Sequence, residues 1–463
     1  VQLGDSGDTI TIPAGATITN NGTQTGFGRT GTVNWDTTAK TASFTAVSGN
    51  GYFVNTTSGA ITVTLPASPS AGDIVAVADY ANTFATNALT IARNGSPING
   101  GSNDYQNSTN GISLTFVYVD GTRGWKNVND GTTDATGLPP FIVATGGTVV
   151  TCGNFKTHIF TGPGTFCVSS IAPSPSGNPN AIDYLVVAGG AGGAGNNGGG
   201  GGAGGFRLSN CASLPSPTMS PLVNACGAIT ATATAFPITV GAAGTAGTVS
   251  GATASGGSGG NSTFSTITSA GGGGGSTRGG PTANGINGGS GGGGGGEDAG
   301  SAGNGNTPPV SPPQGNHGGD GGGPSPRASG GGGGAGATGG PGAPSQNAGP
   351  GGVGSFIADA FIGPTAPSYG TPGPVSSVRY FSGGGGAGVE STPGLGLGSN
   401  GAGGSGGGGQ GGPGPTAGGG GGAGTTNTGG GGGGASRYNC GSAPVTSGGA
   451  GGSGIVMIRY KFQ

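Results

Sequence analysis

Residues 182–206 read IDYLVVAGGAGGAGNNGGGGGAGGF, and this stretch joins the two kinds of sequence that make up the chain. Its first six residues are a mostly apolar, strand-forming run, and glycine dominates the other nineteen. Of the 123 glycines in the chain, 25 lie in residues 1–180, which leaves 123 − 25 = 98 for the remaining 283 residues. The stretch therefore predicts a strand that enters a separate, glycine-rich region.

Three features indicate that the glycine-rich region folds, although glycine-rich sequence is commonly a flexible linker. Strand-like sequence stands on both sides of it, at 155–160, 165–168, 182–187 and 455–462. Aromatic residues recur through it, and its six longest uninterrupted glycine runs have five or six residues each. We therefore predict a glycine-rich domain over 188–463 that is closed by a strand at 454–462, with a linker and entry strands over 136–187.

Polyglycine has a regular conformation that suits these runs, a left-handed helix with three residues per turn that makes no internal hydrogen bonds. Each N–H and C=O group must then find a partner on a neighbouring segment. Ordering glycine costs more backbone entropy than ordering any other residue, so only a cooperative bundle is stable. A collagen helix is excluded because glycine does not recur strictly at every third position. We expect a bundle of polyglycine II helices bracketed by β-strands.

The N-terminal region is predicted to be all-β. In AITVTL, residues 60–65, Ile61, Val63 and Leu65 alternate with polar residues, as in a half-buried strand. Similar strand-like runs stand at 73–78, 89–92, 112–119 and 124–128, and Asn-Gly pairs between several of them supply turns. We predict a β attachment or shaft segment over 1–40 and a β-sandwich over 41–135, with Trp125 as a core aromatic.

Composition excludes several classes of protein. Charged residues are 6% of the chain and the 13 Lys and Arg are scattered, which argues against nucleic-acid binding. No apolar run reaches the roughly 20 residues of a membrane span, so no membrane insertion is expected. The five cysteines have no CxxC spacing, which argues against a zinc site. Cys211 and Cys226 bracket a Pro- and Ser-rich loop; they either pair as a disulfide or remain small buried thiols.

Glycine runs carry no side chains, so specificity is expected in the loops between them. The richest loop is 356–381, FIADAFIGPTAPSYGTPGPVSSVRYF. Its aromatic and arginine side chains are of the types that anchor protein or glycan surfaces: Phe356, Phe361, Tyr369, Arg379, Tyr380 and Phe381. The alternative is that these aromatics supply a core for the domain or pack on a neighbouring chain.

The sequence has few residues in arrangements typical of catalysis, and we predict no catalytic, cofactor or metal site. His158 lies in strand-like sequence, where a structural histidine is the simpler interpretation. His317 and Asp320 have neither a nucleophile context nor a third ligand. Glu297 and Asp298 are adjacent in an extended chain, so they cannot both point into one cleft and are expected in a solvated loop.

Two stretches resemble known phage proteins. GYFVNTTSGAITVTLPASPSAGDIVAVADYANTF with GTRGWKNV is similar to a module of tail-fibre and other virion proteins of marine phages, especially those of cyanobacteria. KTHIFTGPGTFCVSS, IDYLVVAGGAGG, FPITVGAAG and the closing GGSGIVMIRYKF resemble, in this order, the glycine-rich domain at the ends of phage tail fibres. The second stretch is also similar in style to the polyglycine receptor-binding adhesins of T-even-type phages.

The resemblance implies a non-enzymatic structural virion protein, outside the cell, that binds a host surface protein or glycan. We expect it to contact other tail proteins and to form a homo-oligomer, a trimer, through its N-terminal region. Two alternatives remain open. The chain belongs to a cellular filament or surface matrix, or it is a tail-spike depolymerase, which would need paired carboxylates in a groove.

Overall fold

A computed structural model describes most of the chain. The described residues are 33–129 and 141–463, apart from gaps at 173–179, 212–213, 215–217, 226, 249–253, 279–282, 298, 324–326, 344–346, 392–397, 415–418 and 439–445; a few positions between 9 and 19 are also described. The chain divides into two compact units, Val1–Leu138 and Pro139–Gln463, which we call the first unit and the glycine-rich unit.

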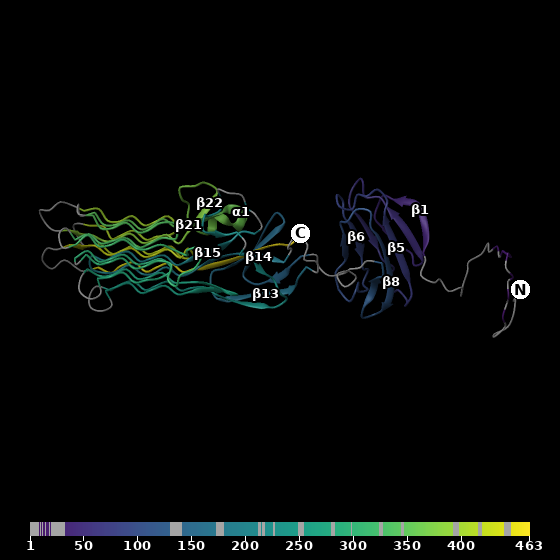
Figure 1. Cartoon of the computed structure of the whole chain (residues 1–463), viewed down its shortest axis with the longest axis horizontal. Helices are drawn as coiled ribbons and strands as arrows, with labels where there is room; N and C mark the ends of the chain where they lie inside the picture. The colour runs from purple at the N-terminus through teal and green to yellow at the C-terminus, as the bar shows by residue number, and fades with distance from the viewer. Residues whose placement is uncertain are drawn as a thin grey trace. The chain divides into compact units, whose positions relative to one another are not determined.

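The first unit is a sandwich of two sheets (Figure 1). One sheet has the order β1-β3-β5-β8-β9, built from Asn34–Lys40, Asn50–Val54, Ile74–Asp79, Ser113–Asp120 and Gly124–Asn127. The other has the order β2-β4-β6-β7, built from Phe44–Thr45, Ile61–Thr64, Leu89–Ala92 and Tyr105–Asn107. Parallel pairing joins β1, β3 and β5, and also β2, β4 and β6.

The core of the first unit lies between its sheets and confirms the predicted strand faces. Ile61, Val63 and Leu65 are buried in one cluster with Trp125. Asn94 and Asn99 have the positive φ angles, 48° and 52°, that their turns require. Strand β1 pairs with β3, so the sandwich includes residues before its expected start at 41, whereas most of the expected 1–40 segment lies outside the described residues.

Two further sheets form one end of the glycine-rich unit. A five-stranded sheet has the order β10-β13-β18-β19-β20, from Val143–Thr145, Gly164–Ser170, Ala235–Thr239, Ser262–Phe264 and Ile267–Ser269. The larger sheet has the order β11-β12-β25-β14-β15-β16, from Thr148–Cys152, Phe155–Phe160, Ile455–Lys461, Ala181–Val187, Phe206–Ser209 and Val223–Asn224, and β17, Ile229–Thr230, pairs with β14. The predicted C-terminal strand thus pairs antiparallel with both β12 and β14.

The larger sheet is buried on both faces. Along β14, Ile182, Tyr184 and Val186 face the five-stranded sheet. Leu185 and Val187 face the opposite way, into a second core. That second core is covered by an insertion of β21, α1, η2 and β22, from Ser355–Ala358, Asp359–Ile362, Ala366–Ser368 and Val378–Phe381. Burial on both faces explains why this strand is apolar along most of its length, with Asp183 as the exception.

Glycine segments run side by side away from these sheets (Figure 1), and their hydrogen bonds repeat every three residues. In the segment 188–196, Ala188, Ala191 and Ala194 donate to Gly205, Gly202 and Gly199. The next residue of each triplet donates to segment 254–260, and the third donates to segment 446–452. Three successive residues therefore bond to three different neighbours.

Segment 198–205 is the centre of the bundle. All eight of its backbone N–H groups donate to other segments, over distances of 2.8–3.1 Å. Counting the bonds it accepts, it has six neighbours, 188–194, 270–276, 290–293, 330–333, 385–388 and 429–435. Six neighbours around one rod is hexagonal packing, and further segments surround this ring.

Hexagonal packing explains where the uninterrupted glycine runs occur. A Cβ added to Gly200 or Gly201 would lie closer than 3.0 Å to backbone atoms of a neighbouring segment, so these interior positions exclude side chains, whereas Ala203 of the same segment is accommodated fully buried. Outer segments carry exposed side chains at every third position, as at Asn347, Pro350 and Val353. Most of the long glycine runs thus lie in the interior, although the run that contains Gly420 is on an outer segment, and a three-residue spacing of other residues marks the surface.

Candidate functional site

The predicted recognition residues lie in the insertion that covers the larger sheet. Phe361, Tyr380 and Phe381 are buried, and Phe361 and Phe381 belong to the core beneath the insertion. Phe356 is half-buried, with its ring 5.2 Å from that of Tyr380, and Tyr369 packs against the same core. Burial of three of the aromatics agrees with the alternative interpretation, in which they supply core packing.

Arg379 stabilises the insertion from within. Its Nε donates to Tyr369 O at 2.7 Å and its Nη2 donates to Gly370 O at 3.1 Å. Thr157 Oγ1 of β12 donates to Phe361 O at 2.8 Å, which fastens α1 to the sheet. The part of the insertion that a ligand can reach is therefore its outer loop, where Val375 is exposed. Few of the residues predicted from the sequence to bind a receptor are accessible there.

A cluster of charged residues lies at the far end, meaning the end of the glycine segments remote from the sheets. The turn at Asn196 and Asn197 is at this end, because it joins a segment leaving β14 to a segment entering β15. Nine described residues between 188 and 454 are Asp, Glu, Lys or Arg, and five of them stand in far-end turns: Arg278, Glu297, Arg327, Glu390 and Arg437. The side of the bundle is nearly free of charge.

Four of these residues form an alternating ionic chain, which we call the far-end network: Arg278, Glu297, Arg327 and Glu390. The Arg278 guanidinium donates to both Glu297 oxygens, with Nη2 2.7 Å from Oε1. Arg327 bridges two carboxylates, since Nη2 is 3.0 Å from Glu297 Oε1 and Nη1 is 3.1 Å from Glu390 Oε1. The expected solvated loop at Glu297 is therefore wrong, because nothing local in the sequence indicates arginine partners 19 and 30 residues away.

The charges in the far-end network reinforce one another. The hydrogen bond from Arg278, with the charges of Arg278 and Arg327, holds the pKa of Glu297 below its ordinary 4.5. The Glu390 side chain is 3% exposed, and its Oε2 has no hydrogen-bond partner among the described residues. A buried carboxylate is costly unless it is paired, so Glu390 depends on Arg327.

The histidines have structural roles. His158 is fully buried, with Nδ1 2.6 Å from Gly146 O and Nε2 3.1 Å from Tyr460 Oη, and burial lowers its pKa. His317 and Asp320 lie three residues apart on an outer segment, where each accepts a backbone N–H of the neighbouring segment, from Gly305 and Ala302. These bonds cap the edge of the bundle.

Among the described residues, no three His, Cys, Asp or Glu side chains gather as a metal site. Nor is any described helix long and apolar enough to cross a membrane. Cys226 lies outside the described residues, so the disulfide with Cys211 stays a prediction; Cys211 Sγ donates to Ala225 O, directly before Cys226, at 3.0 Å. Asp298 also lies outside the described residues.

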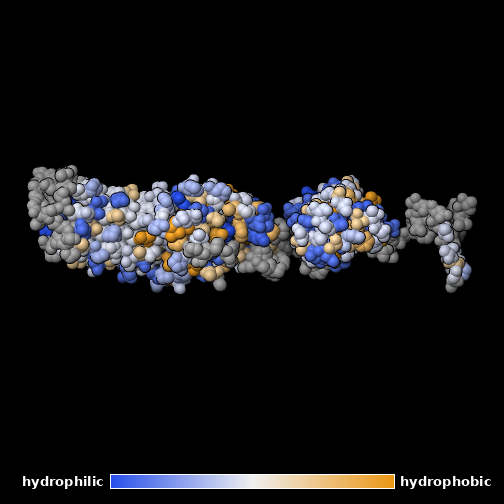
Figure 2. All heavy atoms as spheres, turned by 90° about the horizontal axis from the view of Figure 1, so that it is seen from above, coloured by the Kyte–Doolittle hydropathy of each residue, from blue (hydrophilic) through white to orange (hydrophobic). Residues whose placement is uncertain are grey.

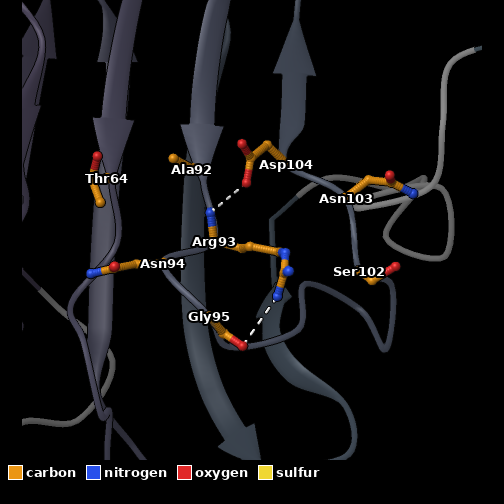
Figure 3. Close-up of a pocket in the computed structure, with 8 residues that line it drawn as sticks. All are labelled: Thr64, Ala92, Arg93, Asn94, Gly95, Ser102, Asn103 and Asp104. Atoms are coloured by element: carbon orange, nitrogen blue, oxygen red, sulfur yellow. Dashed lines mark hydrogen bonds between the residues drawn. The ribbon is translucent and has the colours of Figure 1, made fainter.

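The first unit has an open groove of about 520 Å³ at one end of β4 and β6 (Figure 3). Its lining is polar and includes Arg93, Asn94, Asn103 and Asp104. Asp104 Oδ1 accepts the Arg93 backbone N–H at 2.9 Å, and Arg93 Nη1 donates to Gly95 O at 3.1 Å, so both side chains brace the loops that form the groove. The groove is shallow and has no aromatic wall.

Comparison with known families agrees with the architecture. The chain belongs to a family described as the glycine-rich domain, whose model matches residues 161–461, more than half of the sequence. The match begins between β12 and β13 and ends in β25, so it covers strands of both sheets together with the glycine segments. A comparison with curated proteins gives no match.

Proposed function

We propose that this protein is a structural virion component, a phage tail-fibre or tail-tip adhesin that binds the host cell surface through loops on a glycine-rich scaffold. The observation that carries the proposal is the concentration of charged side chains at the far end of a nearly uncharged bundle. A scaffold of fixed segments that presents its polar chemistry at one end suits adhesion better than catalysis.

The scaffold segments are, in this proposal, polyglycine II helices. Three-residue hydrogen-bond spacing, six neighbours around segment 198–205 and the absence of positive φ among its glycines support that conformation. In the view of Figure 2, the orange, hydrophobic residues of this unit gather mainly toward its sheets, so the glycine segments expose few hydrophobic side chains on that face, as a scaffold would. The predicted trimer, formed through the N-terminal region, and the contacts with other tail proteins remain part of the proposal.

Binding of the labelled full chain to a panel of cyanobacterial strains tests the function. We expect saturable binding to some strains and none to others, and removal by unlabelled chain. Loss of binding after periodate treatment of the cells would indicate a glycan, whereas loss after protease treatment would indicate a protein receptor. No saturable binding to any phage-sensitive strain would contradict the proposal.

Two single variants locate the binding surface. Arg437→Gln removes a charge at the far end, and Val375→Gln changes the exposed loop of the insertion. We expect the first to weaken binding several-fold and the second to leave it unchanged, because a partly exposed arginine is a common anchor and a lone exposed valine is not. The opposite result would return recognition to the insertion.

A further inference from the structure

The hydrogen bonds between glycine segments do not by themselves determine how neighbouring segments are aligned along the bundle, that is, their register. Because these hydrogen bonds repeat every three residues, a segment that slips by three residues, about 9 Å, regains the same pattern with its neighbours. Interior glycines have no side chains that would resist such a slip. Side chains at the segment ends must therefore select one register, as hydrophobic patterns do in β-sheets.

The far-end network meets that need with residues from four different turns. We propose that the far-end network is a register lock, in which Glu297 and Arg327 are positioning residues that hold the far-end turns in one arrangement. Its extension to recognition rests on the proposed function, since the lock shapes the surface that would meet the host. The lock itself is a property of the bundle alone.

Arg327 is the centre of the lock because it joins turns that are distant in sequence. Its guanidinium binds Glu297 and Glu390 at 3.0 and 3.1 Å. Its backbone O accepts Asn197 Nδ2 at 3.0 Å, which ties in the turn of the central segment, and the Glu390 N–H at 3.4 Å. A slip by three residues of any segment that ends at Asn197, Glu297, Arg327 or Glu390 would break at least one of these contacts.

Backbone hydrogen bonds next to the lock offer local reporters. Glu297 N donates to Arg278 O at 2.8 Å, and Arg437 N donates to Val389 O at 3.0 Å. With the Glu390 amide, they sample three separate far-end turns. Glu297 has no bond to Glu390 or Arg437 and reaches Glu390 through Arg327, so an effect of Glu297 on those two amides would travel through the lock.

Hydrogen exchange of the full chain, with Glu297→Gln as the test variant, checks the proposal. We expect exchange at the Glu390 and Arg437 amides to be about fivefold faster, the effect of losing a partly exposed ionic bridge, and exchange at the interior Gly201 to stay unchanged. Asp36→Asn is the matched control, because it breaks the ion pair of Asp36 with Lys40 in the first unit. It should leave all three amides unchanged.

Salt provides a second measurement that does not depend on a variant folding. In wild-type protein, 1 M NaCl screens the partly exposed pairs, for which the Debye length falls to about 3 Å, so it should speed exchange at the same amides. A change confined to residues beside Glu297, with Glu390 and Arg437 unaffected by both salt and variant, would overturn the lock. Failure of the wild-type chain to bind host cells would contradict the proposed function and leave the exchange result standing.

Discussion

Gly201→Ala tests whether the bundle interior excludes side chains. Gly201 donates to Gly432 O at 2.8 Å and accepts the Gly385 N–H at 2.9 Å, so it is held on two sides. A Cβ added there would overlap Ala191 O, which itself accepts the Gly432 N–H at 2.8 Å. The only atoms able to move are backbone atoms of a neighbouring segment.

The cost follows from those contacts. Overpacking a close-packed interior costs about 1–3 kcal/mol, and leaving a buried N–H unsatisfied costs about another 1–3 kcal/mol. The sum, about 2–6 kcal/mol, corresponds to a fall of about 4–12 °C in the midpoint of thermal unfolding at about 2 °C per kcal/mol for a unit of this size.

Differential scanning calorimetry of the full chain measures this fall, with Gly420→Ala as the matched control. Gly420 is exposed on an outer segment, and an added Cβ would meet only Ser447 O, at 3.2 Å. Alanine there restricts the unfolded chain and should leave stability unchanged or raise it by up to about 1 kcal/mol. Equal midpoints for the two variants would refute the exclusion of side chains from the interior.

Three further outcomes are expected. Trp125→Ala should cost the first unit about 3–5 kcal/mol, because its ring is fully buried, and should leave the glycine-rich transition in place in calorimetry. Burial lowers the pKa of His158 below its ordinary 6.5, so the contribution of the neutral side chain to stability is present above pH 6.5 and is lost as the pH falls toward the lowered pKa. The midpoint of thermal unfolding of the glycine-rich unit should therefore drop between pH 7.5 and 5.5. His158→Gln should remove the part of that drop that is due to this histidine. Counting thiols in denatured, unreduced protein should give three free groups if Cys211 and Cys226 pair and five if they do not, since the chain has five cysteines.

The strands were predictable because their signals are local. The runs at 89–92 and 155–160 match β6 and β12, and the predicted core residue Trp125 is fully buried. Alternation and turn residues carry this information within a few positions of the chain. The same signals gave no sign of the short helix Asp359–Ile362, which is a single turn stabilised by tertiary packing.

The candidate site was less predictable. The sequence of a proline-rich loop does not show whether its aromatic side chains are binding anchors or core residues. The answer depends on whether a sheet face lies beneath them, as it does here. The far-end network was missed because Glu297 and Glu390 are 93 residues apart and share one arginine (390 − 297 = 93). The sequence does hold a signal, since five of the nine described charged residues between 188 and 454 fall in turns at the far end of glycine segments.

One outer position of the bundle also could not be predicted from the sequence. Beside Gly271 and Gly274 no described segment completes the outer layer, and side chains take its place. Asn261 Oδ1 accepts the Gly271 N–H at 2.9 Å, and the Ile286 side chain lies over Gly274. Nothing in the sequence marks these two side chains, because their role depends on the lack of a neighbouring glycine segment at this position among the described residues.

Local signals in the sequence predict the all-β class, the strand faces, the division near the start of the glycine-rich region and the need for glycine segments to find bonding partners. These follow from periodicity, turn chemistry and backbone hydrogen bonding, which act over short distances. Long-range packing selects which segments are interior, which aromatics are core and which charges meet at the far end. Glycine has no side chain to encode a partner, so the choice of neighbours emerges from the packing of the whole bundle.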